Sequence, residues 1–192
     1  MNKYKEVYVR APSRLHFGLL AWGPDAPRSF GGLGLMIQHP GLYLRARRAA
    51  SSADACRGPL SQRGEAVVKA VRERLATRGS DPGPIELEIL TAPKEHMGLG
   101  TGTQLGLGVA TAVARLAGVT VDIVELACWI GRGARSGIGV HGFDRGGLIV
   151  DGGHPRGAPD SQRPAPCVAR LDFPEDWPIL VILPRPEVDW SG

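Results

Sequence analysis

Pro93-Lys94-Glu95-His96-Met97-Gly98-Leu99-Gly100-Thr101-Gly102-Thr103-Gln104 is the stretch on which the interpretation of the whole chain depends. Its glycines alternate with larger residues, so the backbone can bend tightly and approach a ligand closely. Apolar residues then recur with helical spacing from Leu105 to Leu116, and either Thr101 or Thr103 is expected to cap this helix. A glycine loop before a buried helix presents N–H groups to an anion, so we predict a phosphate-binding loop.

This loop differs from two common nucleotide-binding loops. It contains no Gly-Lys-Ser/Thr, so it is not a Walker loop. It also lacks the Gly-x-Gly-x-x-Gly spacing that a dinucleotide site combines with an acidic residue about 20 residues further on. Glycine-rich turns before helices also occur without any ligand, and that alternative stays open on this stretch alone.

The composition favours an anionic small molecule as partner. The chain has 192 residues, 27 glycines and a net charge of +4, with 43% hydrophobic and 6% aromatic residues. Nucleic-acid binding usually needs a dense basic stripe with aromatic platforms, whereas the arginines here are scattered. We therefore expect one globular domain and no nucleic-acid partner.

Cysteine usage and hydropathy predict a cytoplasmic location. Cys56, Cys128 and Cys167 are far apart and have no metal-ligand spacing, which favours a reducing compartment. The N-terminus is polar and carries no signal-peptide pattern. No apolar run reaches the length of about 18 residues that a membrane span needs, so no membrane association is expected.

The apolar pattern predicts a mixture of strands and helices. Strands are expected over residues 7–11, 31–37, 42–47, 85–89, 148–151, 167–173 and 178–183. We expect Pro12 to end the first strand and His39-Pro40-Gly41 to turn the second into the third as a hairpin. Residues 178–183 form a continuous apolar run, which is typical of a central strand. Ser61 is expected to cap one helix, and Asp122-x-x-Glu125 predicts the capping box of another.

Polar residues in three other segments are candidates for the same site. Arg14 and His16 would share one face if the first strand continued past Pro12. A second glycine-rich run, residues 131–147, contains Arg132, Arg135 and Arg145. Arginine forks match phosphate and carboxylate oxygens in a bidentate manner. For both segments, solvated surface arginines are the alternative interpretation.

Four separate segments resemble β-ribofuranosylaminobenzene 5′-phosphate synthases, which are members of the GHMP kinase superfamily. These segments cover residues 13–19, 28–34, 98–105 and 131–153. The superfamily's phosphate loop runs Pro-x-x-x-Gly-Leu-Gly-Ser-Ser, whereas the loop here is one residue longer and has threonine and glycine in place of the serines. GHMP kinases also carry Ser-Gly-x-Asp, whose Asp acts on the acceptor hydroxyl. Gly139 stands at that position here, and Asp144 is expected to point elsewhere, which argues against a kinase.

The resemblance implies an α+β fold. We expect a GHMP-type N-terminal domain with a ribosomal-protein-like fold over residues 1–192. Its mixed sheet should have the helices packed on one face. The C-terminal GHMP subdomain is expected to be largely absent.

The resemblance also implies a reaction. The family joins phosphoribosyl pyrophosphate to 4-aminobenzoate or 4-hydroxybenzoate and releases carbon dioxide and pyrophosphate, an early step towards tetrahydromethanopterin. This chemistry implies Mg²⁺ and no other cofactor, and a homodimer is one expected assembly. Two alternatives stay open, an ATP-dependent small-molecule kinase of the GHMP type and an inactive truncated fragment that acts as an interaction partner.

Site residues follow from the matched segments. The expected catalytic residues are Arg14, His16 and Arg28, and His16 could act as an acid near neutral pH. The expected phosphate-binding residues are Gly98, Leu99, Gly100, Thr101, Gly102, Thr103, Gln104, Arg132, Arg135 and Ser136. Thr101 is also the expected metal-binding residue.

Overall fold

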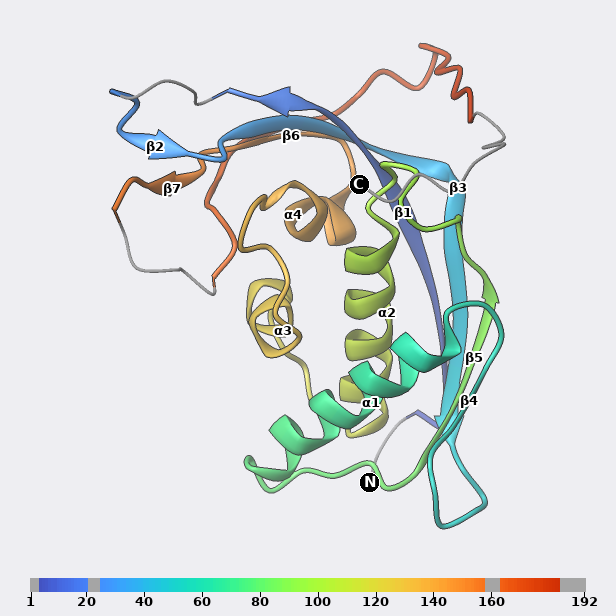
Figure 1. Ribbon diagram of the computed structural model, residues 1–192. Coiled ribbons are helices and arrows are strands. Elements are labelled where there is room, and N and C mark those ends of the chain that lie inside the picture. The colour runs from blue at the N-terminus through green and yellow to red at the C-terminus, as the bar shows by residue number, and fades with distance from the viewer. Residues whose placement is uncertain (1–3, 21–24, 158–162, 184–192) are drawn as a thin grey trace.

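The described residues form a bent sheet with helices packed on its inner face (Figure 1). The computed structural model describes residues 4–20, 25–157 and 163–183. The strands are β1 Glu6–Leu19, β2 Arg28–Ser29, β3 Gly32–Arg48, β4 Ala55–Arg57, β5 Ile85–Thr91, β6 Leu148–Asp151, β7 His154–Pro155 and β8 Cys167–Leu171. The helices are α1 Ser61–Ala76, α2 Thr101–Leu116, α3 Ile123–Trp129 and α4 Ile138–Arg145.

The main sheet is mixed, as predicted for an α+β fold. Its strand order is β4-β5-β3-β6-β8, and β1 pairs with β3 along both halves of that long strand. The β4–β5 pair is parallel and the other pairs of this sheet are antiparallel. A separate short ribbon joins β2 to β7. Because β5 pairs with the second half of β3 and β6 with the first, the sheet has two arms.

The predicted strand end at Pro12 and the predicted hairpin are both wrong. Ala11 pairs with Leu42 and Ser13 pairs with Ile37, so β3 advances five residues while β1 advances two. The segment around the cis His39–Pro40 bond is therefore a bulge in one continuous strand. Proline lacks an N–H and is tolerated where the ladder is interrupted, which explains why Pro12 does not end β1. As a result, β1 continues and carries Arg14 and His16 into the second arm.

The helix α2 lies in the middle of the helical layer (Figure 1). Twelve of its 16 residues are buried, so it is surrounded by the sheet and the other helices. Glycines allow this close packing, since a Cβ on Gly108 would lie 3.2 Å from Leu44 Cδ2. A Cβ on Gly106 would lie 2.7 Å from Ile130 Cδ1. The apolar run after the glycine loop is therefore the central helix of the fold.

The helix starts differ from two predictions and confirm a third. Gly100 is the N-cap of α2 in a left-handed conformation, with no side-chain cap, so neither Thr101 nor Thr103 caps the helix. Leu60, and not Ser61, is the N-cap of α1. Asp122 caps α3 as predicted, because its side chain accepts hydrogen bonds from the N–H groups of Val124 (2.8 Å) and Glu125 (3.4 Å).

Replacing Asp122 by alanine is expected to lower the free energy of unfolding by about 1 kcal/mol, because the N–H groups at the start of α3 lose their acceptor. Urea unfolding followed by far-UV circular dichroism measures this change. Thr120→Ala is the matched control, since Thr120 is exposed in the same connection. An equal loss of stability in both variants would contradict the capping role.

Two predicted elements are wrong near the C-terminal side. Residues 178–183 pair with no strand in the described part of the chain, and Leu180 is 85% exposed. An apolar run becomes a central strand only where strands flank it, and β6 and β8 complete this arm of the sheet. The second concerns the glycine-rich run 131–147, for which no helix was predicted although it contains α4.

Two further predictions concern the cysteines and the membrane. The thiols of Cys56, Cys128 and Cys167 are all free. No helix in the described ranges has both the length and the apolar character needed to cross a bilayer.

Candidate functional site

The predicted phosphate loop turns through two left-handed glycines and contacts β1. Gly98 has φ 75° and Gly100 has φ 70°, a region that strongly favours glycine. Leu99 between them is buried, and its carbonyl accepts a hydrogen bond from the Arg14 N–H at 2.9 Å. The loop is therefore held against the second arm of the sheet. The first N–H groups of α2 have no acceptor within the helix and are available to an anion.

Three arginines surround the start of α2. A Cβ on Gly102 would lie 3.4 Å from Arg63 Nη1 and 3.6 Å from Arg132 Nη2. On the other side, a Cβ on Gly100 would lie 3.5 Å from Arg14 Nε. Glycine at these positions lets the guanidinium groups approach the backbone closely. The structure thus brings the predicted Arg14 and Arg132 together at the predicted loop.

Arg63 was not predicted, because on the sequence it is one of several cations on the polar face of an amphipathic helix. Its side chain forms an ion pair with Glu95 of the loop. Arg135, which was predicted, is exposed and makes no hydrogen bond or ion pair with another described residue. The structure therefore places Arg63 and Arg132, and not Arg135, beside the first turn of α2.

Two buried polar atoms at this site lack a hydrogen-bond partner among the described residues. These atoms are Arg14 Nε and Gln104 Oε1. Gln104 is only 1% exposed, and its Nε2 donates to the Gly139 carbonyl at 2.8 Å, which fixes the orientation of the amide. Buried polar groups are normally paired, so unpaired atoms mark a place where a ligand can supply the missing bond.

Burial lowers the pKa of both Arg14 and His16 on β1. Burial lowers the pKa of Arg14, and the charge of Asp151 opposes this shift. The pKa of His16 is lowered by burial first and by Arg14 second, while Asp151 raises it. A pKa below the usual 6.5 leaves the His16 ring neutral at pH 7. This direction disfavours the predicted role of His16 as an acid.

The hydrogen bonds of His16 identify its tautomer. Nδ1 accepts a bond from the Gly18 N–H at 3.2 Å, so in the neutral ring the proton lies on Nε2. A Cβ on Gly32 would lie 3.3 Å from this Nε2. His16 is therefore suited to donate a hydrogen bond to an oxygen of a ligand.

Arg28, a predicted catalytic residue, directs its guanidinium at two backbone carbonyls. Its Nε donates to the Gly152 carbonyl at 2.5 Å and its Nη2 donates to the Gly153 carbonyl at 2.8 Å. These bonds tie β2 to the turn that follows β6. The guanidinium holds the backbone of that turn in place.

Asp151 is the functional candidate that the sequence reasoning missed. It is 2% exposed and accepts three hydrogen bonds, from Ser136 Oγ (3.0 Å), Gly137 N (2.6 Å) and Gly153 N (2.8 Å). The predicted phosphate-binding hydroxyl of Ser136 is therefore engaged by a carboxylate. The available signal was a charged residue that closes an apolar strand before two glycines.

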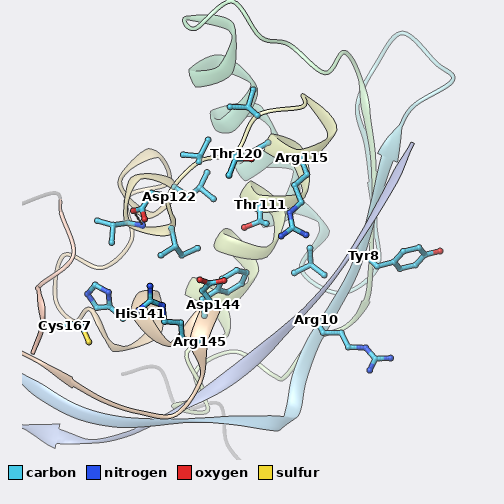
Figure 2. Close-up of a pocket in the computed structure, with 18 of the residues that line it drawn as sticks. Tyr8, Arg10, Thr111, Arg115, Thr120, Asp122, His141, Asp144, Arg145 and Cys167 are labelled. Atoms are coloured by element: carbon cyan, nitrogen blue, oxygen red, sulfur yellow. Dashed lines mark hydrogen bonds between the residues drawn. The ribbon is translucent and has the colours of Figure 1, made fainter. Parts of the chain in front are cut away.

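Gly139 and Asp144 lie on different sides of α4, as predicted. A Cβ on Gly139 would lie 3.4 Å from both Thr103 and Gln104, so this position faces the phosphate loop. Asp144 instead lines a cavity of about 970 Å³ (Figure 2). No side chain of this helix supplies a carboxylate at the loop.

That large cavity is an open groove between the first half of β1 and the helical layer (Figure 2). Its labelled lining residues include Tyr8, Arg10, Thr111, Arg115, His141 and Asp144. None of the predicted catalytic or phosphate-binding residues lines it. We assign the candidate site to the loop, because the glycine turns, the three arginines and the unpaired atoms meet there.

The described residues offer little to a resident metal ion. No group of three or more His, Cys, Asp or Glu side chains is arranged for a metal in the part of the chain that the structure describes. At the loop, side-chain oxygens belong to the predicted Thr101, which is 5% exposed, to Thr103 and Gln104, and to Glu95, whose carboxylate is ion-paired with Arg63. Mg²⁺ usually needs one or two carboxylates in addition to phosphate oxygens, so this donor set does not form a metal centre of its own.

Comparison with known proteins shows which proteins this chain resembles. Residues 65–147 match the family model described as the GHMP kinases N terminal domain. Curated proteins named beta-ribofuranosylphenol 5'-phosphate synthase from Archaeoglobus fulgidus and Methanothermobacter thermautotrophicus are each 35% identical to this chain, over 185 and 201 residues. The alignments cover 92% and 97% of this chain but 56% and 60% of those relatives.

Solved structures with a similar fold include two kinases. Homoserine kinase from Cytophaga hutchinsonii has a TM-score of 0.56 and 16% identity, over 79% of this chain and 50% of that chain. Streptococcus pneumoniae phosphomevalonate kinase has a TM-score of 0.51 and 21% identity, over 66% of this chain and 40% of that chain. At these identities the similarity shows the fold alone. Residues 65–147 therefore match the N-terminal domain of GHMP kinases, the superfamily that the glycine-rich segments predicted.

Proposed function

We propose that the chain supplies the phosphate-binding part of a synthase that joins phosphoribosyl pyrophosphate to a 4-substituted benzoate. The observation that carries this proposal is the 35% identity to curated synthases over nearly all of this chain. The chain spans less than two thirds of the length of those relatives. The proposal therefore concerns the loop, the arginines around it and His16.

The proposed reaction forms one bond and breaks two. The ring carbon that bears the carboxylate attacks C1 of the ribose, and the bond from C1 to the pyrophosphate oxygen breaks. The carbon–carboxylate bond then breaks, its electron pair restores the aromatic ring, and carbon dioxide leaves. Charge on the departing pyrophosphate must be stabilised, while no covalent protein nucleophile is required.

The charges of the site fit these demands. The N–H groups of the loop from Gly98 to Gln104 would bind one phosphate group, with Arg63 and Arg132 beside it. Arg14 would bind pyrophosphate or the benzoate carboxylate through its unpaired Nε. His16 would donate from Nε2 to an oxygen of the leaving group. Mg²⁺ would arrive bound to the pyrophosphate, since the one carboxylate of the loop, Glu95, is ion-paired with Arg63.

Gly139 favours this synthase over a GHMP kinase. The position faces Thr103 and Gln104 of the loop, so a carboxylate there would lie beside the phosphates. Glycine can neither accept a proton nor orient an acceptor hydroxyl. Ribosyl transfer to a ring carbon requires no such base, because the carboxylate leaves as carbon dioxide.

The name of the relatives points to one acceptor. Both are named for a ribofuranosylphenol product, which corresponds to 4-hydroxybenzoate as the acceptor. We propose 4-hydroxybenzoate as the better substrate of this chain. The homodimer and the cytoplasmic location also stay proposals, and analytical ultracentrifugation and cell fractionation test them.

The test uses carboxyl-labelled 4-hydroxybenzoate and 4-aminobenzoate in separate reactions with phosphoribosyl pyrophosphate and Mg²⁺. We expect labelled carbon dioxide from the first at a higher rate than from the second. The Archaeoglobus fulgidus relative is assayed in parallel as the positive control. If that relative releases label and this chain releases none with either acid, the chain is not an active synthase, and the fragment interpretation gains support.

The ion pair between Arg63 and Glu95 predicts opposite effects of two single substitutions on pyrophosphate binding. Arg63→Ala should weaken binding about tenfold, because a cation beside the first turn of α2 is lost. Glu95→Gln should tighten binding about threefold, because Arg63 is released and a negative charge leaves the loop. Isothermal titration calorimetry with inorganic pyrophosphate measures both constants.

Arg74→Ala is the control for this pair, because Arg74 lies on the same helix and is exposed away from the loop. It removes the same charge and should leave binding unchanged. In the Arg63→Ala background, Glu95→Gln should tighten binding less than it does alone. Equal weakening by Arg63→Ala and Arg74→Ala would show that only net charge matters.

A further inference from the structure

Four residues on three neighbouring strands share one face of the sheet beside the phosphate loop. His16 of β1 pairs with Gly34 of β3, and Gly32 of β3 pairs with Asp151 of β6. Residues directly opposite one another, and residues two apart on a strand, point to the same face. His16, Gly34, Gly32 and Asp151 therefore lie in a row across the sheet, and Arg14 joins them on β1.

The two middle positions of this row have no side chain. A Cβ on Gly32 would lie 3.3 Å from His16 Nε2, so any larger residue would occupy the space between the ring and Asp151. Ile138, the first residue of α4, covers both glycines, at 3.3 Å from a Cβ on Gly32 and 2.7 Å from a Cβ on Gly34. Charges at the two ends of the row thus interact through an apolar region, where screening by water is weak.

Asp151 is a buried carboxylate with no ion pair among the residues that the structure describes. Its three hydrogen bonds come from one hydroxyl and two backbone N–H groups, all of them uncharged. Burying an ion without a partner is costly. The positive charge that compensates Asp151 is therefore that of Arg14, which acts without touching it.

The same carboxylate joins segments that are far apart in the sequence. Ser136 and Gly137 come from the second glycine-rich run, just before α4, and Gly153 comes from the turn after β6. Arg28 holds the turn after β6 in place, because its guanidinium donates hydrogen bonds to the carbonyls of Gly152 and Gly153. Loss of the carboxylate would release the start of α4, which contacts the phosphate loop through Gly139.

We propose that Asp151 is a positioning residue of the site, which aligns the start of α4 with the phosphate loop and supplies the negative charge that balances Arg14. It touches no reacting group in this arrangement and acts through the residues around it. The inference rests on the proposed function for the role of Arg14 and His16. Its test uses no substrate, so the two can fail separately.

The test follows the pKa of His16 by NMR of its ring protons. The charged groups that act on His16 are Arg14 on its own strand and Asp151 on β6. Asp151→Asn removes the group that raises the pKa of His16, so the pKa should fall further below its usual value. Asp151→Glu keeps the charge, and the pKa of His16 should stay closer to that of the unchanged chain.

Asp144→Asn is the matched control. It removes one negative charge from the exposed side of α4, away from the row, and should leave the pKa of His16 unchanged. A merely structural role for Asp151 would lower stability without moving the pKa of His16 in this direction. The proposal is overturned if Asp151→Asn leaves that pKa unchanged, or if Asp144→Asn lowers it equally.

A measurement on the unchanged chain covers the case in which Asp151→Asn does not fold. When His16 gains or loses its proton, the electric field at an interacting carboxylate changes. The carboxyl carbon of Asp151 should therefore show a chemical-shift change at the pH where His16 titrates. The carboxyl carbon of Asp144 should show none there. Absence of this inflection at Asp151 would overturn the proposal without any variant.

Discussion

Replacing Arg14 by methionine should abolish most binding and activity while changing the free energy of unfolding little. Arg14 Nε is buried without a partner among the described residues, and burial lowers the pKa of the group. Burial of the cation opposes folding, whereas its charge balances the buried Asp151, so the two effects of an apolar side chain of similar length should largely offset one another. We expect a fall of about a hundredfold or more in kcat/KM, as for the loss of one preorganised charge-stabilising group.

This combination separates a functional arginine from a structural one. The backbone bond from Arg14 N–H to the Leu99 carbonyl does not depend on the side chain and should persist. Arg10→Met is the control, because Arg10 lies on the other arm of β1, where its guanidinium is 5.2 Å from the centre of the Tyr43 ring. Urea unfolding and synthase kinetics are measured on both variants. A large loss of stability in Arg14→Met with normal pyrophosphate binding would refute the assignment.

The sequence predicted best those features that depend on local pattern. The apolar periodicity after the glycine loop predicted α2, and the glycine spacing predicted a turn that only glycine adopts easily at Gly98 and Gly100. The absence of a carboxylate at Gly139 was also visible in the sequence, and the structure places that position at the loop. Each of these depends on residues that are neighbours along the chain.

The errors arise where tertiary contacts override local preference. The helix α4 was missed because Gly139 and Gly142 lower its helix propensity, yet they allow close contact with Thr103 and with Met36. The hairpin was predicted because His39-Pro40-Gly41 is a turn sequence, and β1 instead pairs across the bulge on both sides of it. The predicted threonine cap of α2 was wrong because Gly100, in a left-handed conformation, is the N-cap of this helix.

The missed site residues have a common cause. Asp151 and Arg63 acquire a role only through residues that are distant in the sequence, namely Ser136 for the first and Glu95 for the second. On the sequence, Asp151 is a strand-ending acid and Arg63 is a helix-surface cation. Neither pattern distinguishes a site residue from a solvated one, because the partners become neighbours only in the folded protein.

Gly34→Ala is expected to be among the most destabilising single substitutions in this chain, at about 3 kcal/mol. A Cβ there would lie 2.7 Å from the Leu15 carbonyl oxygen and 2.7 Å from Ile138 Cγ2. The carbonyl belongs to a strand paired with β3 and cannot retreat without breaking the ladder. Ile138 is fully buried at the start of α4, so relief of the clash would displace that helix.

Gly139→Ala is the matched control for Gly34→Ala, because it also adds one methyl group at a buried glycine. Its Cβ would meet Thr103 and Gln104 at 3.4 Å, an ordinary contact, and alanine in a helix is favoured over glycine by about 0.5–1 kcal/mol. Urea unfolding should therefore show opposite signs for the two variants. Because displacing α4 also moves Gly137 away from Asp151, folded Gly34→Ala protein should bind pyrophosphate more weakly. Equal stability of the two variants would mean that β1 and α4 can separate at Gly34, and the close packing that aligns the loop with Asp151 would not be required.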